Sequence, residues 1–279
     1  SIFWNKNENT LLVNTKNDGL YKLTNTICID EGKPRAGKAD NITSIFSPEP
    51  NLVIGSNETT QVLSGDAKVC KTPTVAVLTV KSSYYQIYSN GIKDINETSK
   101  SVYDSTKPIT CAASNGVQLV LGHEDGTVIL FHSLFSDYDS ITLSHVCGVS
   151  ICEKYLVISQ MNAVSLYDFS LNKFKEFPMP SQPVSMAFCN HGRELYVGLH
   201  CGAVLRITEQ TTTYIGFFNE DPQVISPKES QSLALIMSDS LYIYTNPHLV
   251  QTDLTDIDCI SACLETKSPW NVILYFIKN

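Results

Sequence analysis

Short apolar segments recur along the chain at a nearly constant spacing. Their cores begin at Leu11, Leu52, Tyr85, Leu119, Leu156, Leu195, Ala234 and Val272. The successive intervals are 41, 33, 34, 37, 39, 39 and 38 residues. Propeller blades built from four strands repeat at roughly 40 to 45 residues. The pattern therefore predicts a series of small, similar β units.

Each unit shows the same succession of strands and turns. An apolar segment precedes the core, as residues 42–46 precede the core at Leu52, and a polar turn separates the two. A tight turn then leads to a third strand, as Asp125-Gly126 leads to residues 127–131. Asp-Gly between alternating segments is a strong hairpin signal because the turn requires positive φ. A more polar fourth segment follows, so each unit is predicted to form four antiparallel strands.

The segments favour strands over helices throughout. They are four to eight residues long, rich in β-branched and aromatic residues, and bounded by turn residues. No ten-residue amphipathic stretch is present to supply the helices of ankyrin or tetratricopeptide repeats. An immunoglobulin-type array would need about 100 residues per domain. We therefore predict an all-β fold, a β-propeller of four-stranded antiparallel blades.

Two segments resemble a known repeat family. Residues 121–131 (LGHEDGTVILF) resemble the turn and third strand of a WD40 repeat, and residues 165–168 (SLYD) are similar to its Trp-Asp ending with Tyr in place of Trp. No unit has a true Trp-Asp pair, and Gly122-His123 lies between the second and third strands. The family's hydrogen-bond tetrad is therefore not carried over. The resemblance implies a WD40-like propeller that serves as an interaction scaffold in a larger assembly.

The end of the chain decides the number of blades. Seven units are complete between residues 1 and 254, and residues 255–279 supply only two further strand-like segments, 259–263 and 271–277. A propeller ring must close, or sheet edges stay exposed. We predict a seven-bladed propeller over 1–254 and a closing or extra hairpin over 255–279. Eight blades with an incomplete last one, or an N-terminal segment that completes the last blade, remain alternatives.

Composition and charge exclude several kinds of partner. The 279 residues carry 20 basic and 28 acidic side chains, a net charge of -8, and no basic stripe. Nucleic acids and anionic membrane surfaces draw affinity from clustered Lys and Arg, so neither is an expected partner. The longest apolar run, residues 272–277, is too short for a membrane span.

The nine cysteines indicate the cellular compartment, and the first residue indicates whether the chain is part of a longer one. The cysteines lack the regular spacing of a disulfide framework and lie mostly in apolar segments. This pattern indicates reduced thiols in a cytoplasmic or nuclear protein. The sequence begins at Ser1 rather than at a methionine, so we expect a trimmed chain or part of a longer one.

The search for chemistry gives no catalytic site. The chain has no G-x-S-x-G elbow and no nucleotide-binding fingerprint. Cys189, His191, His200 and Cys201 are zinc-ligand types, but a predicted strand of about six residues, roughly 20 Å, separates the two pairs. We predict no catalytic residue, metal or cofactor, and we do not expect a small-molecule ligand.

The loops of a propeller are shared between two rims. The first rim carries the turns between second and third strands and the connections from a fourth strand to the next first strand; the second rim carries the other turns. We predict that a protein or peptide partner in a multi-subunit assembly binds through the rim loops. Either rim is an alternative at this point, and the candidates come from the first rim. The candidate residues are Lys16, Lys33, Arg35, Lys38, His123, Glu124, Met161, Met179 and His200.

Particular features support these candidates. The long polar loop 31–40 gathers Lys33, Arg35 and Lys38, and Met and Arg are favoured at protein interfaces. His123 is expected on the exposed side of a turn, so His123→Ala should leave thermal stability unchanged. Two alternative functions remain: a metal-dependent propeller hydrolase or lactonase, and a phosphoinositide-binding propeller that uses the three basic residues of this loop.

Overall fold

The computed structural model describes most of the chain as strands and turns. The described residues are 2–5, 10–15, 19–24, 33–34, 44–49, 52–64, 67–97, 101–133, 135–225, 232–236, 240–245, 248–253, 257–264 and 272–278. Side chains are described at 46, 54–62, 67–97, 101–133, 135–222 and 224. These residues contain no helix. Within the same residues, no helix has the length and hydrophobicity to cross a membrane.

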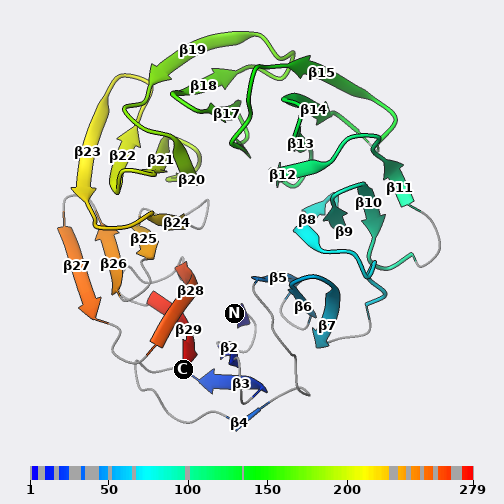
Figure 1. The fold of residues 1–279 in the computed structure, drawn as a ribbon, viewed down its shortest axis with the longest axis vertical. Helices are drawn as coiled ribbons and strands as arrows, with labels where there is room; N and C mark the ends of the chain where they lie inside the picture. Colours follow the sequence, from blue (N-terminus) through cyan, green and yellow to red (C-terminus); the bar gives the residue numbers. More distant parts are fainter. Residues whose placement is uncertain are drawn as a thin grey trace. The chain divides into compact units, whose positions relative to one another are not determined.

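The chain divides into two compact units. Unit 1 combines Ser1–Pro73 with Ile225–Asn279, and unit 2 is Thr74–Val224. Both are built from antiparallel strands that follow chain order within each sheet (Figure 1).

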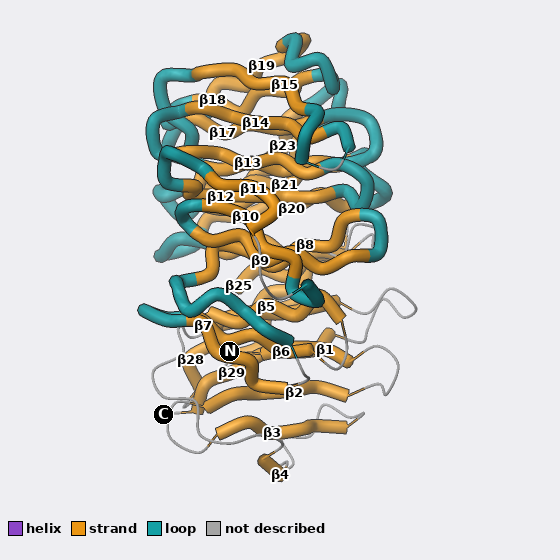
Figure 2. Tube along the Cα trace, turned by 90° about the vertical axis from the view of Figure 1, so that its right-hand side faces the viewer, coloured by secondary structure: helices purple, strands orange, loops and turns teal. Residues whose placement is uncertain are grey.

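Unit 2 consists of four sheets with four strands each. The first two sheets are β8 (Thr74–Val80), β9 (Ser83–Tyr88), β10 (Gly91–Asp94) and β11 (Ser101–Asp104), then β12 (Ile109–Ser114), β13 (Leu119–His123), β14 (Thr127–Phe131) and β15 (Tyr138–Thr142). The next two are β16 (Gly148–Ile151), β17 (Leu156–Gln160), β18 (Ala163–Tyr167) and β19 (Lys173–Pro178), then β20 (Pro183–Cys189), β21 (Glu194–Leu199), β22 (Ala203–Ile207) and β23 (Thr212–Phe217). The first strands β8, β12, β16 and β20 contact one another in turn. Figure 2 shows the connecting loops of this unit at the two ends of its strands.

Unit 1 contains sheets of unequal size. The N-terminal sheet is β1 (Ile2–Asn5), β2 (Thr10–Thr15), β3 (Gly19–Thr24) and β4 (Lys33–Pro34), and β5 (Ser44–Glu49), β6 (Leu52–Ser56) and β7 (Thr60–Ser64) form a three-stranded sheet. The sheet of β24 (Gln223–Ile225), β25 (Ser232–Ile236), β26 (Ser240–Thr245) and β27 (His248–Asp253) starts at the unit boundary. The hairpin β28 (Ile257–Leu264) and β29 (Val272–Lys278) contacts β1 and β2.

The core of unit 2 lies between successive sheets. In β13, Leu119 and Leu121 belong to the cluster shared with the preceding sheet, whereas Val120 belongs to the cluster shared with the following one. Successive side chains of a strand point to opposite faces, so a strand buried on both faces needs a continuous apolar sequence. Leu156-Val157-Ile158 of β17 follows the same rule. These short apolar cores are therefore the second strands of stacked sheets.

The predicted all-β class is confirmed, and the repeated four-stranded blades fit a β-propeller description. Two details differ from the sequence prediction. Lys33 was placed in a long loop, but it lies in β4, where it pairs with Lys22 of β3. The repeat with its core at Leu52 was expected to have four strands, but among the described residues its sheet has three, β5 to β7.

Candidate protein-binding rim

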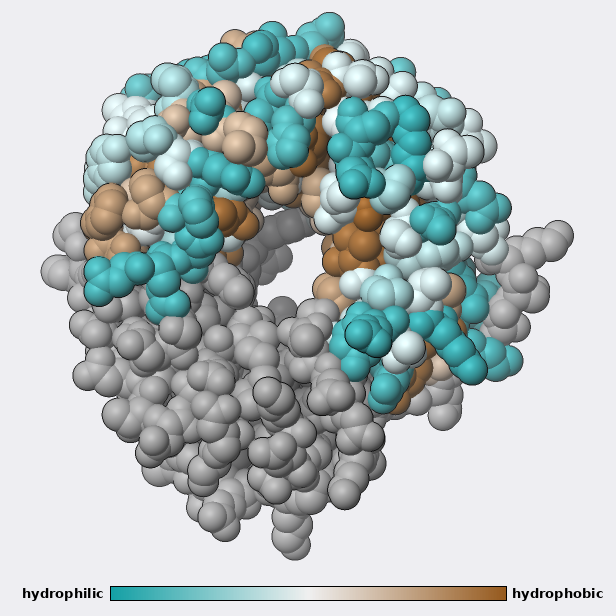
Figure 3. Space-filling view, viewed as in Figure 1, coloured by the Kyte–Doolittle hydropathy of each residue, from teal (hydrophilic) through white to brown (hydrophobic). Residues whose placement is uncertain are grey.

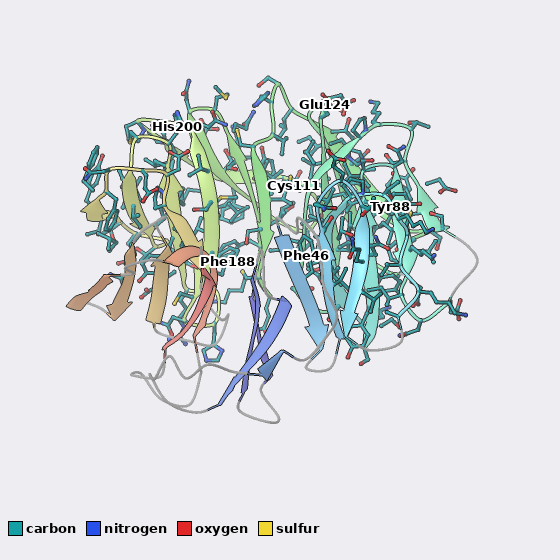
Figure 4. The ribbon with its side chains drawn as sticks, turned by 60° about the horizontal axis from the view of Figure 1, so that its bottom comes forward. Phe46, Tyr88, Cys111, Glu124, Phe188 and His200 are labelled. Carbon is teal, nitrogen blue, oxygen red and sulfur yellow. The ribbon has the colours of Figure 1, made fainter. Side chains whose placement is uncertain are left out.

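The first rim of unit 2 carries the turns that follow β9, β13, β17 and β21 and the connections that follow β11, β15, β19 and β23. Figure 4 shows Glu124 and His200, from two different sheets, at the same end of this unit. Both side chains are exposed. The predicted grouping of these two candidates on one rim therefore agrees with the structure.

One main-chain hydrogen bond recurs on this rim in all four sheets of unit 2. In each sheet, an amide of the connection that follows the fourth strand donates to a carbonyl oxygen of the turn between the second and third strands. The four bonds are Ser105 N to Asn90 O at 2.9 Å, Leu143 N to Gly126 O at 2.9 Å, Met179 N to Asn162 O at 2.8 Å and Phe218 N to Gly202 O at 2.8 Å. Because backbone groups make it, the bond tolerates different side chains at each turn. It fixes the position of each turn against its connection.

Glycine is required at two of these turns. Gly126 and Gly202 have φ of +85° and +84°, a conformation that other L-residues rarely adopt. A Cβ atom on Gly126 would collide with the carbonyl oxygen of Leu143, and one on Gly202 would collide with that of Phe218. At these two turns, the close approach of the connection therefore excludes a side chain.

An ion pair joins the turn after β13 to the connection before β12. Lys107 Nζ donates to the carboxylate of Asp125, and both side chains are partly exposed. The Thr127 amide donates to Asp125 Oδ1 at 3.1 Å. The hydrogen bonds from Lys107 and Thr127 lower the pKa of Asp125 to about 2. This acidic position stays charged over the physiological pH range, but the exposed pair adds little stability.

His123 does not lie on the exposed side of the turn, so that expectation is wrong. It ends β13, and its side chain is only 2% exposed. Its Nδ1 lies 3.1 Å from the Thr127 carbonyl oxygen, and Nε2 lies 3.1 Å from Ser105 Oγ. A carbonyl oxygen only accepts, so Nδ1 carries the proton. Burial lowers the pKa of His123. The side chain is a structural link and is not available to a partner.

The two predicted methionines differ in exposure. Met161, in the turn after β17, is 45% exposed and is available to a partner. Met179 is only 6% exposed and packs in the cluster between the sheets β16–β19 and β20–β23, together with Phe177 and Leu199. The prediction that Met179 is exposed on the rim for a partner is therefore wrong. Although prolines flank it, its side chain lies in the core.

His200 faces a carboxylate on the same rim. Its Nδ1 lies 2.9 Å from Asp221 Oδ2, and both side chains are well exposed. Cys201 beside it is exposed as well. Strand β21 lies between this turn and the turn that holds His191, as the sequence indicated. Among the residues that the structure describes, no group of three His, Cys, Asp or Glu side chains is placed to hold a metal ion.

The four basic candidates, Lys16, Lys33, Arg35 and Lys38, belong to unit 1. Lys16, Arg35 and Lys38 are outside the described residues, and for Lys33 only the backbone is described. The phosphoinositide hypothesis depends on these side chains and stays a hypothesis.

Sequence reasoning missed Lys107 as a rim residue. It lies 18 residues before its partner Asp125, and nothing in the local pattern connects the two. Asp125 itself was visible in the Asp-Gly signal, but it was assigned only to the turn.

Comparisons with known proteins inform the fold and not the activity. The chain is similar to the crystal structure of the computationally designed Ika8 protein, with a TM-score of 0.68 and 13% sequence identity over 99% of this chain and 95% of that chain. At this identity the likeness shows the fold alone. No protein-family model matches the chain. No curated protein matches it.

Proposed function

We propose that this protein is a non-catalytic interaction scaffold that binds a protein or peptide partner through its first rim, as a subunit of a larger assembly. The observation that carries the proposal is the main-chain hydrogen bond that recurs in all four sheets of unit 2. It holds each turn against its connection through backbone atoms, with asparagine as the acceptor residue at two turns and glycine at the other two. A partner then binds preordered loops and does not have to order them, which reduces the entropic cost of binding.

The side chains of the rim suit a protein partner. Met161 supplies an exposed apolar contact, whereas Glu124 and the pairs Lys107–Asp125 and His200–Asp221 supply charged and polar groups. Methionine surrounded by polar groups is typical of protein interfaces, in which an apolar centre is enclosed by a polar margin. Loops on a stiff scaffold commonly carry recognition.

The proposal includes a WD40-like ring. In it, the sheets within residues 1–254 are seven blades, and the hairpin β28–β29 is a closing or extra element. The alternative is an eight-bladed ring whose last blade has two strands. An electron-density map of the whole protein distinguishes the two by the number of blades around the axis.

A charge reversal on each rim tests the proposed function. Glu124 lies in a first-rim turn, and Glu153 lies in the turn between β16 and β17 on the second rim; both are exposed. The full-length protein and the variants Glu124→Lys and Glu153→Lys are captured from the native cell, and the co-purifying chains are quantified. We expect Glu124→Lys to lose a partner that Glu153→Lys retains, with the melting temperature unchanged in both. Retention of every partner by Glu124→Lys together with loss in Glu153→Lys would overturn the choice of rim.

A further inference from the structure

The fourth strand of the last sheet of unit 2 has an open edge. The strand order of this sheet is β20-β21-β22-β23, so β23 is its outer strand. No other strand among the described residues pairs with β23 besides β22. Along such an edge, backbone N–H and C=O groups are available to a further strand.

This edge differs from the other outer strands of unit 2 in charge. Proteins commonly protect exposed edges with charged side chains or proline. Strand β11 carries Asp104 and β15 carries Asp139. Strand β19 carries two lysines, a glutamate and Pro178. Strand β23, with the sequence TTYIGF, has neither a charge nor a proline. It is the outer strand of this unit that lacks the usual protection.

Two of the four exposed side chains of β23 are aromatic, and these two share one face. Tyr214 is 63% and Phe217 72% exposed. The register shifts between Val204 and Leu205, so Tyr214 pairs with Leu205 and Phe217 pairs with Ala203. Leu205 and Ala203 are alternate residues of β22 and point to the same face. The irregularity in β23 therefore brings both aromatic side chains to that face. Figure 3 shows hydrophobic side chains gathered on the outer wall near the end of β23.

Charges beyond the strand indicate what kind of segment fits. The exposed Glu209 precedes β23, and the exposed Asp221 follows it. The whole chain carries a net charge of -8. A segment with basic residues at its ends is attracted to both ends of this edge, whereas a second copy of this acidic chain is repelled.

We propose that β23 accepts an extended segment of a partner protein as a fifth strand of the sheet β20–β23. The segment has uncharged β-branched or aromatic residues at alternate positions and Lys or Arg at its ends. Its backbone pairs with the open edge of β23, and its side chains on one face contact Tyr214 and Phe217. Strand addition of this kind takes affinity from main-chain hydrogen bonds and specificity from alternate side chains. The proposal concerns the outer strand β23 and shares Asp221 with the first rim.

The test uses the full chain and a defined probe. The probe is a short fluorescent peptide in which valine and threonine alternate between terminal lysines. Binding is measured by fluorescence anisotropy for the wild-type protein, Tyr214→Lys and Tyr138→Lys. Tyr138 is the matched control because it is also an exposed tyrosine of an outer strand, but its strand contains Asp139. Thermal melting checks that each variant is folded, and Phe217→Lys serves as a second variant of the same face.

The expected result is saturable binding that Tyr214→Lys and Phe217→Lys each weaken by about tenfold and that Tyr138→Lys leaves unchanged. Hydrogen exchange should show new protection of amides in 212–217 on binding and none in 138–142. A peptide with alternate N-methylated amides should not bind, because it lacks donors for the edge. Equal binding of the wild type and both β23 variants would overturn the proposal. So would concentration-dependent dimerisation that Tyr214→Lys abolishes, because the occupant would then be a second copy of this chain.

Discussion

The imidazole Nε2 of His123 lies 3.1 Å from the hydroxyl oxygen of Ser105. His123 ends strand β13, and Ser105 lies in the connection from β11 to β12. The bond therefore ties one sheet of unit 2 to the segment that enters it from the preceding sheet. The Ser105 amide also donates the rim hydrogen bond to Asn90. One residue of the connection is thus held by its backbone on one side and by its side chain on the other.

Truncation of His123 should destabilise the fold. His123→Ala removes the bonds to Ser105 and Thr127 and leaves a cavity at a position only 2% exposed. Loss of a buried hydrogen-bonding group costs about 1–3 kcal/mol, so we expect a decrease of at least that size in the free energy of unfolding. Urea denaturation measures it, with Glu124→Ala as the exposed control. Equal midpoints for the two variants would show that His123 is not a structural link.

The same histidine should make stability depend on pH. Burial lowers the pKa of His123 below its ordinary value of 6.5; the Thr127 carbonyl and Asp125 oppose this effect, and Lys107 adds to it. Between the folded-state pKa and 6.5, the unfolded chain binds more protons than the folded one. The contribution of His123 to the free energy of unfolding is therefore complete above pH 6.5, and it is lost as the pH falls towards the folded-state pKa. Urea unfolding from pH about 7.5 to about 5.5 should therefore show a steeper loss in wild type than in His123→Gln. Parallel curves would contradict the assignment.

Local signals in the sequence predicted the elements well. The short apolar cores and the Asp125-Gly126 turn depend on neighbours within a few residues, and the structure places a hairpin with positive φ at Gly126. The cores at Leu119 and Leu156 were recognised from their regular spacing, and the structure explains their apolar sequence, because each strand is covered on both faces.

Side-chain placement on the rim was predicted less well, because it depends on distant partners. His123 and Glu124 are adjacent, yet one is buried and the other exposed, since the strand ends between them. Met179 stands between two prolines, but the space between two sheets receives its side chain. The recurring rim hydrogen bond joins residues 15 to 17 positions apart through backbone atoms, as in Ser105 to Asn90 and Leu143 to Gly126. No residue type marks such a contact in a sequence.

A glycine substitution should show what the close approach at the rim contributes. In Gly126→Ala the new Cβ meets both an unfavourable φ and the Leu143 carbonyl. Gly116 is a matched control because its φ is +92° but nothing lies within 4 Å of a Cβ built there. We expect Gly116→Ala to cost about 1 kcal/mol from backbone conformation alone and Gly126→Ala clearly more. Thermal or urea denaturation compares the two. Equal losses of stability would mean that the Leu143 backbone shifts away from the new Cβ at no cost.

The strongest electrostatic effect in unit 2 is expected from Glu194 and Arg206. Their side chains are only 14% and 22% exposed, and Arg206 Nη2 lies 2.5 Å from Glu194 Oε1. The Tyr196 hydroxyl donates to the other carboxylate oxygen at 2.7 Å. Burial alone would raise the pKa of Glu194, but the hydrogen bonds from Arg206 and Tyr196 outweigh it and lower the pKa. The carboxylate is therefore charged and depends on its partner.

Removal of one member of the Glu194–Arg206 pair should lower the free energy of unfolding more than removal of both. Arg206→Leu leaves the buried Glu194 carboxylate without its counter-charge, and such a change costs about 3 kcal/mol. The double variant Glu194→Leu with Arg206→Leu should regain most of this loss, because apolar residues replace the pair without an isolated charge. Lys173→Leu provides the control: its pair with Glu176 is about half exposed, so screening by solvent leaves little effect on stability. Urea denaturation of the four proteins measures these differences. A double variant less stable than Arg206→Leu would show that the ion pair itself, rather than the avoidance of an unpaired charge, stabilises the sheet.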